Sequence, residues 1–154
     1  MSVNIGGKTL DGDIGEWSAS TRLDGPGTGV TGYAMYGDLQ GGVFTIAITT
    51  DGLAIGANTT IWLDTDLDRT SGYQIWGWAG GAEDNVNSGS DGVARLYSGA
   101  AGETLIGDLD YALSADGTTL ELAIDASLIG SPSAIRVYSD VNDSVYLPND
   151  YATA

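Results

Sequence analysis

Three aspartates alternate along the chain directly after a strand-like run, within the segment 60–73. Asp64, Asp66 and Asp68 stand at positions i, i+2 and i+4. A curved backbone aims alternate carboxylates of this kind at a common centre, and clustered hard oxygen ligands are typical of calcium loops. The spacing therefore predicts a Ca²⁺ site made by these three acids.

The acidic segment does not follow the EF-hand pattern. An EF-hand loop has glycine at its sixth position and a bidentate glutamate at its twelfth, and those places hold Arg69 and Ile75 here. A later acid must therefore complete the metal shell. We predict Glu83 in that role, with the adjacent Asp84 as the other candidate. The alternative interpretation is a solvated acidic turn that binds no metal.

A second group of residues that could bind a ligand is aromatic. The segment 72–78 reads as a strand that places two tryptophans and a glutamine on one face. Flat aromatic faces stack on sugar rings while amide and charged side chains bind the hydroxyl groups, so this pattern predicts a carbohydrate site. The alternative is that the tryptophans fill the core. The predicted ligand residues are Trp76, Trp78, Trp62, Gln74, Asn85, Asn87, Arg95 and Tyr97.

The charge balance restricts the partners. Asp and Glu number 21 against 5 Lys and Arg, which gives a formal net charge of −16, and the chain has no cysteine and no histidine. Nucleic acids and anionic membranes require basic patches, so we expect neither as a partner. Disulfides, thiol nucleophiles, Ser-His-Asp triads and Cys/His zinc sites are excluded. Bound calcium would offset the repulsion between the carboxylates.

Composition and spacing predict an all-β fold that positions these residues. The chain has 24 glycines and 3 prolines, and apolar residues alternate with period two between turn-forming residues. We predict one domain, 1–154, folded as a single antiparallel β-sandwich, jelly-roll-like, with two sheets and about 8–11 strands. The predicted strands are 30–36, 43–49, 60–64, 72–78, 92–98, 109–113, 118–124 and 134–139. The predicted turns are 37–38, 51–52, 80–81, 91–92 and 116–117.

The alternation also predicts which side chains face the core. Ile61 and Leu63 should point inward, while Trp62 and Asp64 face the opposite way. One helical turn at 125–130 should bridge the two sheets. Two further acidic segments, 11–17 and 140–144, are open to two interpretations, an ion site or a simple turn. The other predicted core residues are Phe44, Ile46, Ile48, Leu120, Leu122 and Ile124.

Several segments together resemble the family 9 carbohydrate-binding modules and their DOMON-like relatives. The resemblance is carried by Leu10-Asp11-Gly12-Asp13 to Trp17, Trp62-Leu63-Asp64-Thr65-Asp66 to Thr70-Ser71-Gly72-Tyr73, Gly81-Ala82-Glu83-Asp84-Asn85-Val86 and Glu121-Leu122-Ala123-Ile124. It implies a β-sandwich with structural calcium that clamps sugars between aromatic rings. By position it implies Asp64, Asp66 and Glu83 as metal ligands and Trp76 or Trp78 as a sugar platform. A second clamp tryptophan near the C-terminus has no counterpart here.

These observations together predict a non-catalytic carbohydrate-binding module with structural Ca²⁺, whose partner is a polysaccharide or oligosaccharide. Many Asp, Gly, Asn and Thr residues with a single lysine suit a bacterial module that is secreted and extracellular. We expect a monomer, or a part of a larger multidomain protein, and we find neither a signal sequence nor a membrane span. One alternative is a structural or adhesive calcium-binding module of a large exported protein. The other is a small glycoside hydrolase or lyase that uses paired carboxylates.

Overall fold

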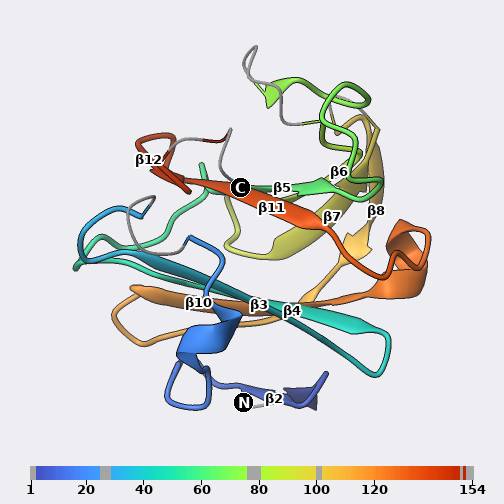
Figure 1. The fold of residues 1–154 in the computed structure, drawn as a ribbon. Coiled ribbons are helices and arrows are strands. Elements are labelled where there is room, and N and C mark those ends of the chain that lie inside the picture. Colours follow the sequence, from blue (N-terminus) through green and yellow to red (C-terminus); the bar gives the residue numbers. More distant parts are fainter. Residues whose placement is uncertain (1–2, 25–28, 76–80, 100–101, 150, 152–154) are drawn as a thin grey trace.

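Two antiparallel sheets packed face to face form the protein in the computed structural model, which describes residues 3–24, 29–75, 81–99, 102–149 and 151 (Figure 1). The predicted all-β sandwich is confirmed. The six-stranded sheet runs β12 (Val145–Leu147), β11 (Arg136–Val141), β5 (Thr60–Asp64), β6 (Asp84–Ser88), β7 (Ala94–Ser98) and β8 (Thr104–Asp108). The four-stranded sheet runs β3 (Ala34–Gln40), β4 (Val43–Thr49), β10 (Thr119–Asp125) and β9 (Asp110–Leu113).

The hydrophobic core lies between the two sheets and follows the predicted alternation. Ile61 and Leu63 of β5 are buried in it, whereas Trp62 packs in a separate cluster on the outer face of the six-stranded sheet. Because side chains alternate along a strand, the outer face of each sheet can also be assigned from its core residues. The core also contains the other predicted residues, Phe44, Ile46, Ile48, Leu120, Leu122 and Ile124.

Two predicted elements are wrong. The predicted turn at 37–38 lies inside β3, and the chain turns instead at Gly41 and Gly42, whose φ angles of 59° and 77° favour glycine. The predicted strand 72–78 is absent from its described part, 72–75. The backbone of Tyr73 pairs with Ala82 as an isolated bridge, because the acidic loop before it turns the chain away from the sheet.

An N-terminal layer covers the outer face of the four-stranded sheet. It includes the hairpin of β1 (Val3–Ile5) and β2 (Lys8–Leu10), drawn below that sheet in Figure 1, and the short turn η1 (Ala19–Thr21) follows it in the chain. Glu121 of β10 is fully buried beneath the segment 11–17. It accepts hydrogen bonds from the backbone of Gly12 at 2.8 Å and from the indole of Trp17 at 3.1 Å.

Each of the two ambiguous acidic segments contains a turn, and the first two residues of the second, Asp140 and Val141, belong to β11. In 11–17, Oδ1 of Asp13 accepts from the backbone of Gly15 at 2.8 Å, which is an Asx turn. In 140–144, Asn142 and Asp143 both have a φ of 55° and form the hairpin turn between β11 and β12. The Asn142 side chain also accepts from the Gly56 backbone at 2.7 Å, which fixes this hairpin to the loop before β5.

The connection from β10 to β11 confirms the predicted bridge between the sheets. The short 3₁₀ turn η3 (Ala126–Ile129) begins at Asp125, whose carboxylate accepts from the Ser127 backbone at 3.0 Å. It ends at Gly130, which has a φ of 85°. Among the described residues, no helix has the length and hydropathy needed to cross a membrane.

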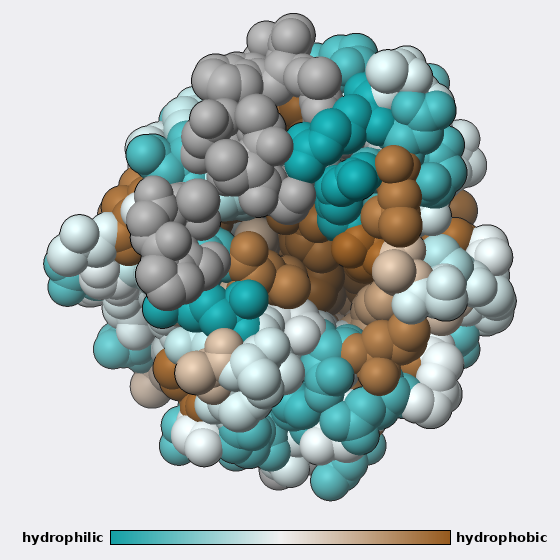
Figure 2. Space-filling model, in the orientation of Figure 1, coloured by the Kyte–Doolittle hydropathy of each residue, from teal (hydrophilic) through white to brown (hydrophobic). Residues whose placement is uncertain are grey.

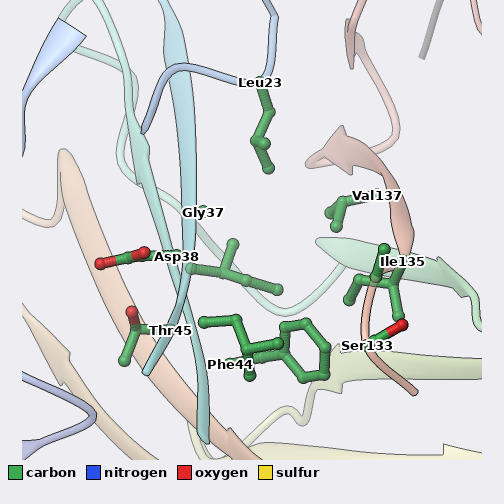
Figure 3. A pocket seen from close by; sticks show the side chains of 11 residues that line it. Leu23, Gly37, Asp38, Phe44, Thr45, Ser133, Ile135 and Val137 are labelled. Carbon is green, nitrogen blue, oxygen red and sulfur yellow. The ribbon is translucent and has the colours of Figure 1, made fainter. Parts of the chain in front are cut away.

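One side of the sandwich is open. Strand β12 pairs only with Ser139–Val141, so the first half of β11 has no neighbour on that side among the described strands. An apolar hollow lies at this opening (Figure 2), and a cavity of about 180 Å³ separates the sheets there. Figure 3 shows Leu23, Phe44 and Val137 pointing into the cavity, whereas the Asp38 carboxylate turns away. The opening is therefore an apolar gap at the edge of the core.

Candidate functional site

The acidic loop begins where β5 ends and is shaped by local hydrogen bonds. Oδ1 of Asp66 accepts from the backbone of Asp68 at 2.9 Å, and Oδ1 of Asp68 accepts from the backbone of Thr70 at 2.9 Å. These two successive Asx turns curl the chain back toward the sheet. Leu67 lies between the aspartates with a φ of 59°, a conformation that a leucine adopts only where its surroundings require it.

Three of the four predicted metal ligands come together. Asp64, Asp66 and Glu83 each place a carboxylate oxygen so that the three oxygens lie within 4.8 Å of one another. Strand β5 positions Asp64 at its last residue, the curled loop positions Asp66, and Glu83 directly precedes β6, which pairs with β5. This group could hold a metal ion.

The buried member of the group carries an unsatisfied oxygen. Asp64 has no exposed surface, and Oδ1 of its carboxylate has no hydrogen-bond partner among the described residues. Its other oxygen, Oδ2, accepts from Nη1 of Arg136 at 3.0 Å. A buried carboxylate oxygen without a partner is costly, and a bound cation would satisfy it.

Burial and mutual repulsion act on the acids of the group. Burial raises the pKa of the Asp64 carboxyl above its usual range, although the hydrogen bond from Arg136 opposes the shift. Burial likewise raises the pKa of Glu83, against the hydrogen bond from the Thr65 backbone and with a further contribution from the charge of Asp66. Both shifts disfavour the ionised forms, and a cation at the centre of the group would reverse them.

Hydrogen bonds hold the two remaining acids in place. Oε1 of Glu83 accepts from the Thr65 backbone at 2.7 Å, which joins the acid to the start of the loop. The Ser71 hydroxyl lies 2.6 Å from Oδ2 of Asp66 and 3.3 Å from Oε2 of Glu83. The loop and the residue before β6 are thus held together even without an ion.

The fourth predicted ligand, Asp68, lies outside the group. Its Oδ1 accepts from both the backbone and the hydroxyl of Thr70, at 2.9 Å and 2.6 Å, and these bonds lower the pKa of its carboxyl. The other candidate, Asp84, is also outside the group. As a residue of β6 it is buried on the same side of the strand as Val86, and burial raises the pKa of its carboxyl to about 6.

Glycine is required behind the acidic group. Gly72 has a φ of 67°, and a Cβ there would collide with the Glu83 carboxylate and with the carbonyl of Ala82. Gly81 has a φ of 69°, and a Cβ there would collide with the carbonyl of Asp68. The two ends of the loop therefore pack so closely that a side chain at Gly72 would displace Glu83, a candidate metal ligand, and one at Gly81 would displace the loop backbone.

Five of the predicted ligand residues lie on the outer face of the six-stranded sheet. The register aligns Tyr138, Trp62, Asn85 and Tyr97 as one row of neighbours across β11, β5, β6 and β7. The adjacent row contains Asp140, Thr60, Asn87 and Arg95. The pairing of the strands thus gathers residues that are separate in the sequence onto one surface.

Part of this outer face is covered. Trp62 stacks on Tyr73 with ring centroids 5.0 Å apart, and both pack against the buried cluster of Ile75, Ala82, Tyr138 and Tyr151. Asn85 is also buried, whereas Asn87, Arg95 and Tyr97 are half-buried. The accessible part of the face therefore lies over β6 and β7.

The three remaining predicted ligand residues differ in their placement. Trp76 and Trp78 lie outside the described residues. Gln74 is half-buried, and its side-chain amide donates to the Ser71 carbonyl at 3.2 Å. This hydrogen bond gives Gln74 a role in holding the acidic loop.

One buried acid on the outer face, Asp140, belongs to the segment 140–144, for which the sequence left an ion site and a simple turn open. Asp140 is 1% exposed, and its carboxylate forms no hydrogen bond of good geometry among the described residues, although the Trp62 indole and the Thr60 backbone lie close enough to lower its pKa. The buried indole N–H of Trp62 likewise forms no hydrogen bond of good geometry there. Burial raises the pKa of Asp140 to about 6, and the charge of Asp143 adds to the shift. The strand register, which puts Asp140 on the face shared with Tyr138, is the signal that could have identified it.

Comparisons with known proteins identify no relative: no family model, curated protein or solved structure matches the chain.

Proposed function

We propose that the protein is a non-catalytic β-sandwich binding module that is stabilised by Ca²⁺ bound to Asp64, Asp66 and Glu83. The observation that carries this proposal is the buried Oδ1 of Asp64, which lacks a partner among the described residues and belongs to a carboxylate grouped with two others. One positive side chain, Arg136, contacts the Asp64 carboxylate. A divalent cation supplies the charge that the group otherwise lacks.

Calcium fits the chemistry of the group better than other common cations. All ligands are oxygens, and the chain has no histidine or cysteine for zinc. The group combines a strand residue, a loop residue and a residue that precedes a strand, an irregular set that suits the variable coordination of Ca²⁺ more than the strict octahedron of Mg²⁺. A site with three protein carboxylates would be filled where calcium is abundant, as it is outside cells. We therefore propose a secreted, extracellular protein.

Thermal unfolding with added CaCl₂, with MgCl₂ and after chelation tests the metal proposal. An ion that binds only the folded state stabilises it by about 2.7 kcal/mol at a concentration of about 100 times its Kd. We expect Asp66→Asn to abolish the calcium-dependent rise in Tm. Asp68→Asn is the matched control, because Asp68 lies in the same loop but outside the group. Equal calcium responses in the wild type and in Asp66→Asn would contradict the proposal.

We further propose that the module binds carbohydrate on the outer face of the six-stranded sheet. The support is the placement of Tyr97 beside Asn85, with Asn87 and Arg95 in the adjacent row. An aromatic ring flanked by amide and guanidinium groups provides a stacking surface and donors for sugar hydroxyls. Asn87, Arg95 and Tyr97 are half-buried, so a ligand can still reach them.

Affinity gels with embedded polysaccharides test the carbohydrate proposal. We expect Tyr97→Ala and Asn87→Ala to remove the retardation that the wild type shows. Tyr111→Ala, an exposed aromatic on the other sheet, is the control. Trp76→Ala and Trp78→Ala extend the test to the other predicted platform. Retention of binding in Tyr97→Ala, or loss in Tyr111→Ala, would argue against this face.

A further inference from the structure

Two edge strands on one side of the sandwich carry exposed apolar side chains. β8 is the last strand of the six-stranded sheet and β9 is the last strand of the four-stranded sheet, and only Leu109 separates them in the chain (Figure 1). Eight large apolar side chains are exposed among the described residues, and four of them lie in this short stretch, so exposed apolar surface is concentrated here. The four are Leu105, Ile106, Tyr111 and Leu113.

The backbone of β8 is open to pairing. β8 pairs with β7 alone among the described strands, so its outer edge offers N–H and C=O groups to another strand. Natural edge strands are commonly protected by lysine or proline. The sequence of β8, Thr-Leu-Ile-Gly-Asp, contains neither. Its pairing with β7 has one register shift, which leaves Ile106 as an extra residue, so the regular parts of the edge lie on either side of Ile106.

The charges around this edge indicate the kind of partner that fits it. Glu103, Asp108 and Asp110 flank the apolar side chains and are exposed, and the stretch 104–113 contains no Lys or Arg. Arg95 of β7 contacts Asp108 at 3.0 Å but is also paired with Asp91 at 2.6 Å. A second copy of the chain, with its own net charge of −16, would be repelled, whereas a basic segment would be attracted.

We propose that β8 binds an extended segment of another polypeptide, rich in apolar and basic residues, that adds as a further strand to the six-stranded sheet. Main-chain hydrogen bonds to β8 provide the pairing, as in other cases of strand addition. Apolar side chains of the segment contact Leu105 and Ile106, and its Lys or Arg residues contact Glu103, Asp108 and Asp110. This inference does not depend on the calcium or the carbohydrate proposal, although its surface adjoins the proposed carbohydrate face, because Leu105 pairs with Tyr97 and Asp108 with Arg95.

Binding of a designed peptide to the full chain tests this inference. The probe is a fluorescent peptide of about ten alternating valines and lysines, and its control has the same sequence with N-methyl groups on alternate backbone amides. We expect the probe to bind and the methylated peptide not to bind. Leu105→Ser should weaken probe binding about tenfold, because a buried apolar contact is lost. Leu128→Ser, at another exposed leucine, on η3, should leave it unchanged.

Four results would overturn the inference. Equal binding of the methylated peptide would show attraction by charge alone, without strand pairing. Failure of the wild type to bind at millimolar probe, or an equal loss in Leu128→Ser, would reject the edge as the site. A dimer in sedimentation that Leu105→Ser dissociates would assign the edge to a second copy instead. Circular dichroism and melting of each variant exclude loss of fold, and Ile106→Ser provides a second variant with the same expected loss.

Discussion

Arg136 of β11 lies opposite Asp64 of β5, and its Nη1 donates to Oδ2 of Asp64 at 3.0 Å while Oδ1 of the same carboxylate remains without a partner among the described residues. The Arg136 side chain is 30% exposed and that of Asp64 is fully buried. One oxygen of the carboxylate is therefore paired with a positive charge of the protein itself, and the same carboxylate is grouped with those of Asp66 and Glu83. The ion pair and the candidate metal site share one buried charge.

Replacement of Arg136 by methionine should destabilise the calcium-free protein by about 1–3 kcal/mol, because a buried carboxylate is left unpaired. Calcium should recover part of this loss, since the ion replaces the missing positive charge. Urea unfolding with and without calcium measures both effects. Arg95→Met, which removes exposed ion pairs only, is the control and should change stability little in either condition. A loss in Arg136→Met that calcium does not reduce would contradict a shared charge.

Gly72→Ala should weaken calcium binding and lower stability together. A Cβ at this residue adds a collision with the Glu83 carboxylate to the cost of its positive φ. Gly52→Ala is the matched control, because Gly52 has a φ of 82° and no atom within 4 Å of an added Cβ. Left-handed backbone costs a non-glycine residue about 1–2 kcal/mol, so thermal melts should show that loss in Gly52→Ala and a larger one in Gly72→Ala. Calcium titrations should distinguish the two variants further, since only Gly72 touches a ligand.

The stability of the protein should fall as pH rises through about 6 because of Asp140. Burial raises the pKa of this carboxyl to about 6 in the folded chain, whereas the unfolded chain keeps the usual value near 3.9. The folded state therefore retains the proton between these values, and the resulting stabilisation is complete below about pH 4 and lost above pH 6. Asp140→Asn should be more stable than the wild type by about 1–3 kcal/mol at pH 8 and equal to it near pH 4. Urea unfolding across this range, with Asp110→Asn as an exposed control, measures the difference.

Glu121→Ala should release the N-terminal layer from the four-stranded sheet. Glu121 is buried and accepts from the Gly12 backbone and the Trp17 indole, so its loss leaves buried donors unpaired at a cost of about 1–3 kcal/mol. Trp17 is only 8% exposed, and its fluorescence emission should shift to longer wavelength as water reaches it. The shift should be absent when Trp17→Phe is added to the variant. Unchanged protease resistance of the segment 3–17 would contradict the expected release.

Side-chain alternation carried most of the fold prediction. Runs such as Thr60–Asp64 show apolar residues on alternate positions, and the structure places Ile61 and Leu63 in the core as expected. β6 was not predicted, because its sequence, Asp-Asn-Val-Asn-Ser, has a single apolar residue and is typical of a loop. Its strand state is set by pairing with β5 and β7 on either side, which is tertiary information.

The sequence likewise predicted one part of the candidate site and not the rest. The spacing of Asp64 and Asp66 predicts that their carboxylates converge, and the group of three that includes Glu83 agrees with it. The spacing could not show that Asp68 is diverted by the backbone and hydroxyl of Thr70, because this competition depends on how the loop curls. Nor could it show that Asp140 is buried, which follows from the layer that packs over Trp62.

The N-terminal layer shields the outer face of the four-stranded sheet from solvent. The Trp17 indole donates to Glu121 in this layer, and the small side chains Ala47 and Ala123 on that side are buried, with exposures of 0% and 4%. A large molecule that approaches the outer face of the four-stranded sheet therefore contacts the hairpin and its loops rather than the sheet itself. Labels or surface attachments placed on the hairpin would leave the opposite broad face free for ligands.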